Sequence, residues 1–160
     1  MSTQYQAGYK LRDLKAHIAA CVGKHIAKGL DAEMLDVELI LTPKHMGHGM
    51  NMMNQRYVAE FYFDRFPFKK YDPAVLFANV GGWLMDNDGE REENDNLDDP
   101  EIEVVIEDED SAEIIINVHF EEPVKVVENL NGDIHWRGKR WSIEQYEIWV
   151  AENLTDVSVR

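Results

Sequence analysis

The segment Arg56-Tyr57-Val58-Ala59-Glu60-Phe61-Tyr62-Phe63, residues 56–63, carries the clearest strand pattern in the chain. Bulky residues recur at every second position, which places them on one face of a strand. These residues are Tyr57, Ala59, Phe61 and Phe63. The opposite face carries Val58 and Tyr62 as well as Glu60, so aromatic side chains lie on both faces of the strand. We therefore predict a strand inside the main sheet of a domain.

A helix and a further strand are predicted before this segment. Residues 9–28 carry apolar side chains at intervals of three or four, and Gly29 stands where a helix would end. The stripe consists of Leu11, Leu14, Ile18, Cys21, Val22 and Ile26. Residues 34–41 alternate as a strand. Residues 43–55 hold two glycines and four methionines and predict a Met-rich loop.

A second helix is predicted to begin at Asp72-Pro73, because aspartate is a good N-cap and proline fits the first helical position. The helix is expected to end near Asp86. Gly81 and Gly82 lie inside it, at a cost of about 1 kcal/mol each relative to alanine. We expect their small size to let the helix lie close to the sheet.

The pattern after Pro100 is almost wholly β. One hairpin is predicted around Asp108-Glu109-Asp110-Ser111, and another around Asn131-Gly132, a strong turn signal. The expected strands are 101–107, 112–121, 124–128, 133–137 and 146–150. The order helix, strand, strand, helix and then strands predicts an α+β fold, a mainly antiparallel sheet with helices packed on one face. We expect a single domain over residues 1–160, with an acidic loop at 86–100.

Charge is divided unevenly along the chain. Of the net charge of -15, residues 1–85 contribute +2 and residues 86–160 contribute -17. Residues 86–110 alone carry 14 acidic side chains and one arginine. Such a field repels nucleic acid, and a sequence-reading nucleic-acid binder would present a basic face instead.

Other features narrow the class of protein further. The single cysteine, Cys21, excludes an intrachain disulfide, and no apolar run approaches the ~18–20 residues of a spanning helix. We expect a soluble protein made in the cytoplasm, with no membrane partner. Common catalytic motifs such as Gly-x-Ser-x-Gly and His-Glu-x-x-His do not occur, so we expect no enzymatic activity and no cofactor.

Two groups of residues are candidates for protein contacts. His45 and His48 among the methionines could hold a soft metal, but the glycines favour first a flexible loop and second a partner-binding loop. Residues 133–141 hold the only basic cluster of the second half and could meet an acidic neighbour, including the acidic loop of another copy. Core packing is the default role for the tryptophans, and an oligomer interface is the sharper possibility. The candidate interface residues are Met46, Met50, Met52, Met53, Trp136, Arg137, Arg140 and Trp141.

The ordered set of these patterns resembles the tail completion protein R family of contractile-tailed bacteriophages, whose members act as tail terminators. The resemblance runs from the first helix to about Val150. It is carried by residues 56–63, by Asp72-Pro73-Ala74-Val75-Leu76-Phe77 running into Trp83-Leu84, by the acidic gap, by Phe120-Glu121-Glu122-Pro123-Val124 and by Gly132-Asp133-Ile134-His135-Trp136.

The resemblance implies a tail-terminator-like fold and a hexameric ring that caps the tail tube at its head-proximal end. Its implied partners are the tail tube, the tail sheath and a neck or head-completion protein, with DNA passing through the lumen without specific binding. We expect the acidic loop or the acidic strand edges to face that lumen. The candidate residues there are Asp88, Glu90, Glu92, Glu93, Asp95, Asp98 and Asp99.

The Met-rich loop is expected to contact the tube or sheath, so deleting residues 45–54 is expected to block tail joining while the monomer still folds. Two other classes of protein compete with the tail terminator. An acidic DNA-mimic inhibitor fits the net charge, although the first half of the chain is near neutral. A hydrolase built on paired carboxylates has no supporting motif.

Overall fold

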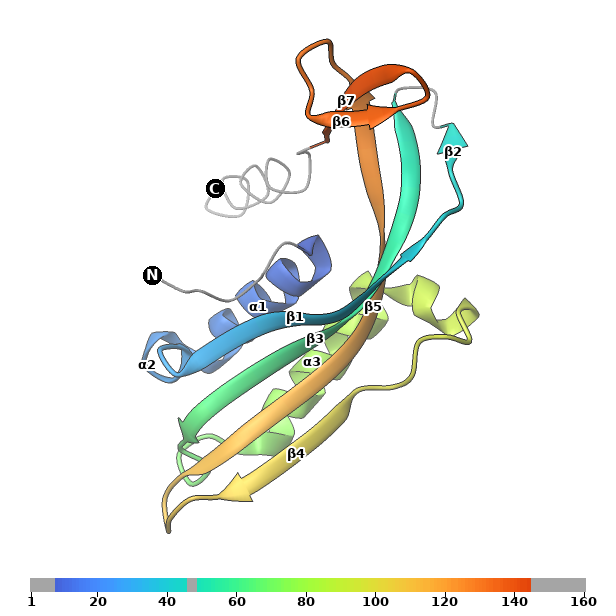
Figure 1. Ribbon diagram of the computed structural model, residues 1–160. Helices are drawn as coiled ribbons and strands as arrows, with labels where there is room; N and C mark the ends of the chain where they lie inside the picture. The colour runs from blue at the N-terminus through green and yellow to red at the C-terminus, as the bar shows by residue number, and fades with distance from the viewer. Residues whose placement is uncertain (1–7, 46–48, 145–160) are drawn as a thin grey trace, which may run out of the picture. The chain divides into compact units, whose positions relative to one another are not determined.

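The computed structural model describes residues 8–45 and 49–144 (Figure 1). It is an α+β fold with a curled antiparallel sheet, as the sequence predicts. Strands follow the order β1-β3-β5-β7-β6, while β2 pairs with β3 and β4 pairs with β5. The strands are β1 Leu30–Ile40, β2 Lys44–His45, β3 Met50–Phe66, β4 Glu101–Ile106, β5 Ala112–Glu128, β6 Ile134–Trp136 and β7 Lys139–Ile143. The helices are α1 Tyr9–Val22, α2 Lys24–Ala27, α3 Pro73–Asn87 and the 3-10 helix η1 Gly89–Glu93.

The chain divides into two compact units. Unit 1 comprises the described residues of Met1–Val37 and Arg56–Glu121, and unit 2 those of Glu38–Gln55 and Glu122–Arg160. Strands β1, β3 and β5 contribute residues to both units. The expected strand at 146–150 lies outside the described residues.

The core of unit 1 lies between the sheet and the helices α1 and α3. The aromatic segment of β3 buries the alternating residues that the sequence predicts, and β5 does the same. The buried residues are Tyr57, Ala59, Phe61 and Phe63 on β3 and Ala112, Ile114, Ile116, Val118 and Phe120 on β5. Because alternate residues of a strand share one face, the helices cover a single face of the sheet. This confirms the predicted layering.

The predicted helix over residues 9–28 is interrupted. Gly23 ends α1 with a φ of 87° and donates its N–H to the carbonyl of Ala19 at 3.1 Å. A positive φ is costly for residues other than glycine, so the chain breaks here and continues as the single turn of α2. The buried stripe on α1, which includes Leu11, Leu14 and Ile18, matches the prediction.

Three strands are longer than expected, and the first of them, β1, begins at Leu30 instead of residue 34. Strand β3 begins at Met50, so the second half of the expected Met-rich loop is strand. Strand β5 runs through Pro123 where two strands were expected. On one edge of β5, the pairing with β4 ends at Asn117 and the pairing with β7 begins at Val126. Pro123 falls in this gap, where its missing N–H breaks no ladder bond on that edge.

Helix α3 begins as predicted. Asp72 is the N-cap and its Oδ1 accepts a hydrogen bond from the Ala74 N–H at 2.9 Å. The expected role of Gly81 and Gly82 is wrong, because a Cβ atom at either position would meet no atom within 4 Å. The helix does not need these glycines in order to lie against the sheet.

The Gly82→Ala variant is therefore expected to be more stable than the parent by about 0.5–1 kcal/mol, because glycine in a helix interior costs that much conformational entropy. Urea unfolding followed by circular dichroism measures the change. A Gly29→Ala variant serves as the contrast, because its Cβ would lie 3.0 Å from the carbonyl oxygen of Asp64. A loss of stability in Gly82→Ala would contradict the open space seen around this position.

The two predicted hairpins have different outcomes. Strands β4 and β5 form the first hairpin as predicted, with Val104 opposite Ile114. The second hairpin joins β6 to β7 instead, and its turn is Arg137-Gly138 rather than Asn131-Gly132. Arg137 and Gly138 have φ values of 55° and 70°, as a type I′ turn requires, so these two residues satisfy the tight turn.

Candidate interaction surfaces

The acidic segment of unit 1 is anchored by a buried ion network. Asp88 is the C-cap of α3 and only 1% exposed. One carboxylate oxygen accepts from the Lys10 ammonium at 2.7 Å, and the other accepts from the Arg91 guanidinium at 2.8 Å. A buried charge is tolerated only with such partners. The expectation that Asp88 belongs to the exposed acidic surface is therefore wrong.

Further contacts fasten the segment to strands β3 and β5. Lys10 also donates to the carbonyl oxygen of Glu121 at 2.8 Å. The Glu121 carboxylate accepts from Asn94 at 3.0 Å and forms an ion pair with Arg56 at 3.1 Å. Arg91 donates to the Asp98 carbonyl at 3.0 Å. The expected loop at 86–100 thus contains the end of α3, the helix η1 and a short segment tied back to the sheet.

The remaining acidic candidates point to solvent. All are exposed while the backbone beneath them is held by the network around Asp88 and Glu121. They are Glu90, Glu92, Glu93, Asp95, Asp98 and Asp99. The segment therefore presents fixed negative charge, in contrast to the freely moving charge of an unstructured tail.

Unit 2 carries the tryptophan–arginine hairpin, residues 134–143. Trp136 and Trp141 pack against each other with ring centroids 5.3 Å apart and ring planes tilted by 50°, and the Trp141 indole N–H donates to the Trp136 carbonyl at 2.8 Å. The Arg137 guanidinium lies 4.4 Å from the centroid of the Trp136 ring, a cation–π geometry. Arg137, Lys139 and Arg140 are exposed. The hairpin therefore presents a rigid basic surface backed by aromatic rings.

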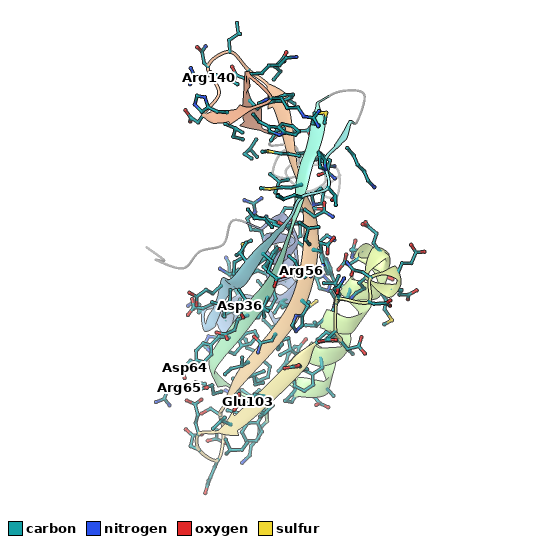
Figure 2. All side chains as sticks on the ribbon, turned by 45° about the vertical axis from the view of Figure 1, so that its right-hand side comes forward. Asp36, Arg56, Asp64, Arg65, Glu103 and Arg140 are labelled. Carbon is teal, nitrogen blue, oxygen red and sulfur yellow. The ribbon has the colours of Figure 1, made fainter. Side chains whose placement is uncertain are left out.

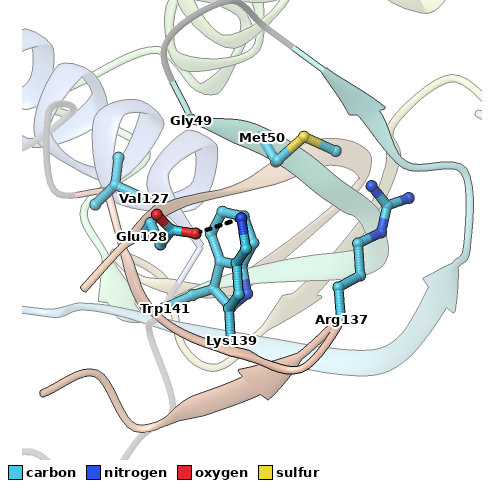
Figure 3. Close-up of a pocket in the computed structure, with 7 residues that line it drawn as sticks. All are labelled: Gly49, Met50, Val127, Glu128, Arg137, Lys139 and Trp141. Atoms are coloured by element: carbon cyan, nitrogen blue, oxygen red, sulfur yellow. Dashed lines mark ion pairs between the residues drawn. The ribbon is translucent and has the colours of Figure 1, made fainter. Parts of the chain in front are cut away.

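A pocket of about 480 Å³ lies beside this hairpin (Figure 3). Its wall includes Met50, Arg137 and Trp141, and the Lys139–Glu128 ion pair at 2.8 Å crosses it. Met50 and Trp141 are buried together with Val126 in the core of unit 2. These two candidate interface residues therefore have a packing role.

The other methionines differ in position. Met52 and Met53 are half-buried, and Met46 lies outside the described residues. Because β3 begins at Met50, deleting residues 45–54 would remove paired strand and a core side chain. We therefore expect the deletion to destabilise unit 2, which revises the expectation that the monomer would still fold.

Strand β4 forms an exposed edge of unit 1, and sequence reasoning did not single it out. All six of its residues are exposed, including Ile102, Val104 and Ile106 at 41%, 45% and 63%. Glu103 is labelled on this strand in Figure 2. In the following turn, the backbone N–H of Asp110 and the hydroxyl of Ser111 hold the pKa of Asp108 below its usual range. The edge thus combines apolar side chains with charged carboxylates.

Within residues 8–45 and 49–144, no group of three or more His, Cys, Asp or Glu side chains is arranged to hold a metal ion. No helix in the same residues has the length and apolar character needed to cross a membrane. The surfaces that stand out are suited to contacts with other proteins: a fixed acidic segment, a basic aromatic hairpin and an apolar strand edge.

Surfaces of this kind are typical of structural proteins that work in an assembly. Comparison with known proteins identifies the family to which the chain belongs. The family model for the P2 phage tail completion protein R (GpR) matches residues 8–145. The chain therefore belongs to this family of phage tail completion proteins, which is a structural family and not an enzyme family. It is accordingly a component of the virion tail.

One relative of the chain comes from a bacteriophage. The "Uncharacterized 19.2 kDa protein in rep-hol intergenic region" of Haemophilus phage HP1 is 30% identical over 115 residues, which cover 71% of this chain and 67% of the relative. No solved structure matches the chain significantly.

Proposed function

We propose that the chain is a tail terminator, one subunit of a hexameric ring that caps the tail tube at its head-proximal end and stops its elongation. The family match over residues 8–145 is the observation that carries this proposal. The exposed apolar edge of β4 supports it, because a long open edge strand on a free monomer invites uncontrolled pairing. Incorporation into a closed ring would remove that exposure.

The acidic segment suits the lumen of such a ring. Its exposed carboxylates, which include Glu90, Glu93 and Asp95, are carried on backbone fixed by the Asp88 and Glu121 contacts. A fixed negative surface repels the phosphate backbone of DNA over about a Debye length. DNA would then pass through the lumen without binding, which a joint between head and tail requires.

The proposed ring has partners on several sides. The tube and the sheath lie on its tail side, and a neck or head-completion protein lies on its head side. The half-buried Met52 and Met53 of unit 2 are the described residues proposed to meet them, because methionine adapts to varied partners.

The mass of the purified protein, measured by light scattering alone and with its tail tube protein, tests this function. We expect a ring of six copies, either free or formed only on the tube, and gold-labelled chain at the head-proximal end of tails in electron micrographs. Tails assembled without the chain are expected to be overlong or unjoined. A chain that stays monomeric with tube protein and is missing from finished tails would refute the proposal.

A further inference from the structure

We propose that the open edge of β4 in one copy is covered by the β6–β7 hairpin of the next copy. The inference rests on the proposed ring and assigns the two surfaces that would join its subunits. It concerns contacts between copies, so that unit 1 of one chain meets unit 2 of another.

The first argument is that β4 needs a cover. It pairs with β5 on one side and has no registered partner on the other among the described residues. Its register places Ile102, Val104 and Ile106 on the same face as the buried residues of β5. Among the described residues of unit 1 these side chains stay 41–63% exposed, although they continue its core surface. Soluble proteins normally protect an edge of this type.

The second argument is that β4 cannot cover itself. Residues 101–110 carry six carboxylates and no lysine or arginine. Arg65 and Lys69 approach Asp108 and Asp110 in the turn at 3.8 and 3.6 Å, but these pairs are exposed. Edge-to-edge pairing of two β4 strands would therefore set like charges against each other, which is destabilising. A head-to-tail contact, with a different surface on the second copy, avoids this repulsion.

The third argument is that the hairpin has the complementary properties. Strand β6 ends the sheet order, so its outer backbone groups also have no registered strand partner among the described residues. Arg137, Lys139 and Arg140 are exposed on this hairpin, and Trp136 beside them is partly exposed. The edge strand β6 itself carries Trp136, and the basic side chains lie beside it in the turn and on β7. An open aromatic edge with basic neighbours matches an acidic, aliphatic edge in hydrogen bonding, charge and polarity.

Thiol crosslinking in assembled tails tests the pairing. Two variants are made in a Cys21→Ser background, Glu103→Cys on β4 and His135→Cys on β6, both at exposed positions. A short bismaleimide is added to tails that contain either variant alone, an equal mixture, or the double variant. We expect no dimer from either single variant, dimers from the mixture, and a ladder up to the closed ring from the double variant.

The outcomes separate the interface from the function. Dimers from Glu103→Cys alone would show a two-fold contact and overturn the inference while leaving the ring intact. Crosslinks from Glu103→Cys to the tube protein, or no crosslinks although the chain is present in the tails, would also overturn it. Absence of the chain from finished tails would refute the proposed function itself, and with it the inference.

A charge exchange gives a second readout. Glu103→Lys is expected to reduce the yield of mixed crosslinks, measured between Val105→Cys and His135→Cys copies, about tenfold, because it sets a base against the basic hairpin. Adding Arg137→Glu is expected to restore most of the yield. Asp31→Lys, an exposed charge reversal on β1, is the matched control and is expected to change nothing. Equal effects of Asp31→Lys and Glu103→Lys would contradict a specific contact at β4.

Discussion

Replacing Asp88 with alanine is expected to lower the free energy of unfolding by about 3–5 kcal/mol, the usual cost of removing one partner from a buried ion pair. The cost is high because the substitution leaves two cations without their carboxylate. The Lys10 ammonium and the Arg91 guanidinium each lie within 2.8 Å of Asp88, and all three side chains are at most 10% exposed. Chemical denaturation monitored by circular dichroism measures the loss.

A matched variant separates burial from charge. Asp98→Ala removes a carboxylate from the same segment, but Asp98 is exposed and accepts a hydrogen bond from Arg91 through its backbone carbonyl. Its expected effect is within about 0.5 kcal/mol. If Asp98→Ala cost as much as Asp88→Ala, net charge rather than the buried network would determine the stability of the segment.

The same network bears on the proposed lumen. Without Asp88, the chain from η1 to Pro100 loses the anchor directly before it, and hydrogen exchange at Arg91 and Asn94 is expected to accelerate. A double-mutant cycle with Lys10→Met measures how far the pair acts as a unit, with an expected coupling of about 0.5–3 kcal/mol. Additive effects would show that Lys10 and Asp88 contribute to stability independently of each other.

The periodic part of the fold could be predicted from the sequence, while the network could not. Tyr57 to Phe63 on β3 and Leu11 to Ile18 on α1 follow strand and helix spacing, so burial can be read directly from the pattern. Asp88 looks like one of many acids in a row. The available signal was Lys10, which precedes Leu14 and Ile18 at steps of four and so lies on the buried stripe. A lysine there requires a buried anion, but the pattern does not say which one.

Turn and edge positions were harder to predict for a different reason. Asn131-Gly132 and Arg137-Gly138 are both plausible turns, and the register of β7 against β5 and β6 decides between them. That register depends on contacts between strands, such as the packing of Trp136 against Trp141. The exposure of β4 likewise depends on which strand lies next to it, which alternation alone does not reveal.

Replacing Gly132 with alanine is expected to destabilise unit 2 by about 4 kcal/mol or more, an unusually large loss that a severe steric conflict can cause. A Cβ atom built at this position would lie 2.0 Å from the Trp141 carbonyl oxygen and 2.4 Å from its carbonyl carbon. These are backbone atoms and cannot rotate away. Trp141 is paired with Glu128 on β5 and with Ile134 on β6, so moving its backbone disturbs both ladders.

The sequence around Gly132 explains why the chain approaches so closely. The Asn129 Oδ1 accepts from the Asn131 N–H at 3.0 Å, and the Gly132 N–H donates to the Asn129 carbonyl at 2.8 Å. The Gly132 carbonyl then accepts from the Arg140 guanidinium at 2.7 Å. Asn131-Gly132 thus does lie in a turn. This turn folds the loop between β5 and β6 onto β7 and is not the turn of the β6–β7 hairpin.

Gly138→Ala is the matched control, because Gly138 belongs to the same hairpin and has open space around its Cβ position. Its φ of 70° alone is expected to cost about 1–2 kcal/mol. Hydrogen exchange at Trp141 and Ser142 measures both variants, with much faster exchange expected for Gly132→Ala and little change in the β3 core of unit 1. Similar losses in the two variants would mean that backbone conformation, and not the close approach to Trp141, makes glycine necessary at position 132.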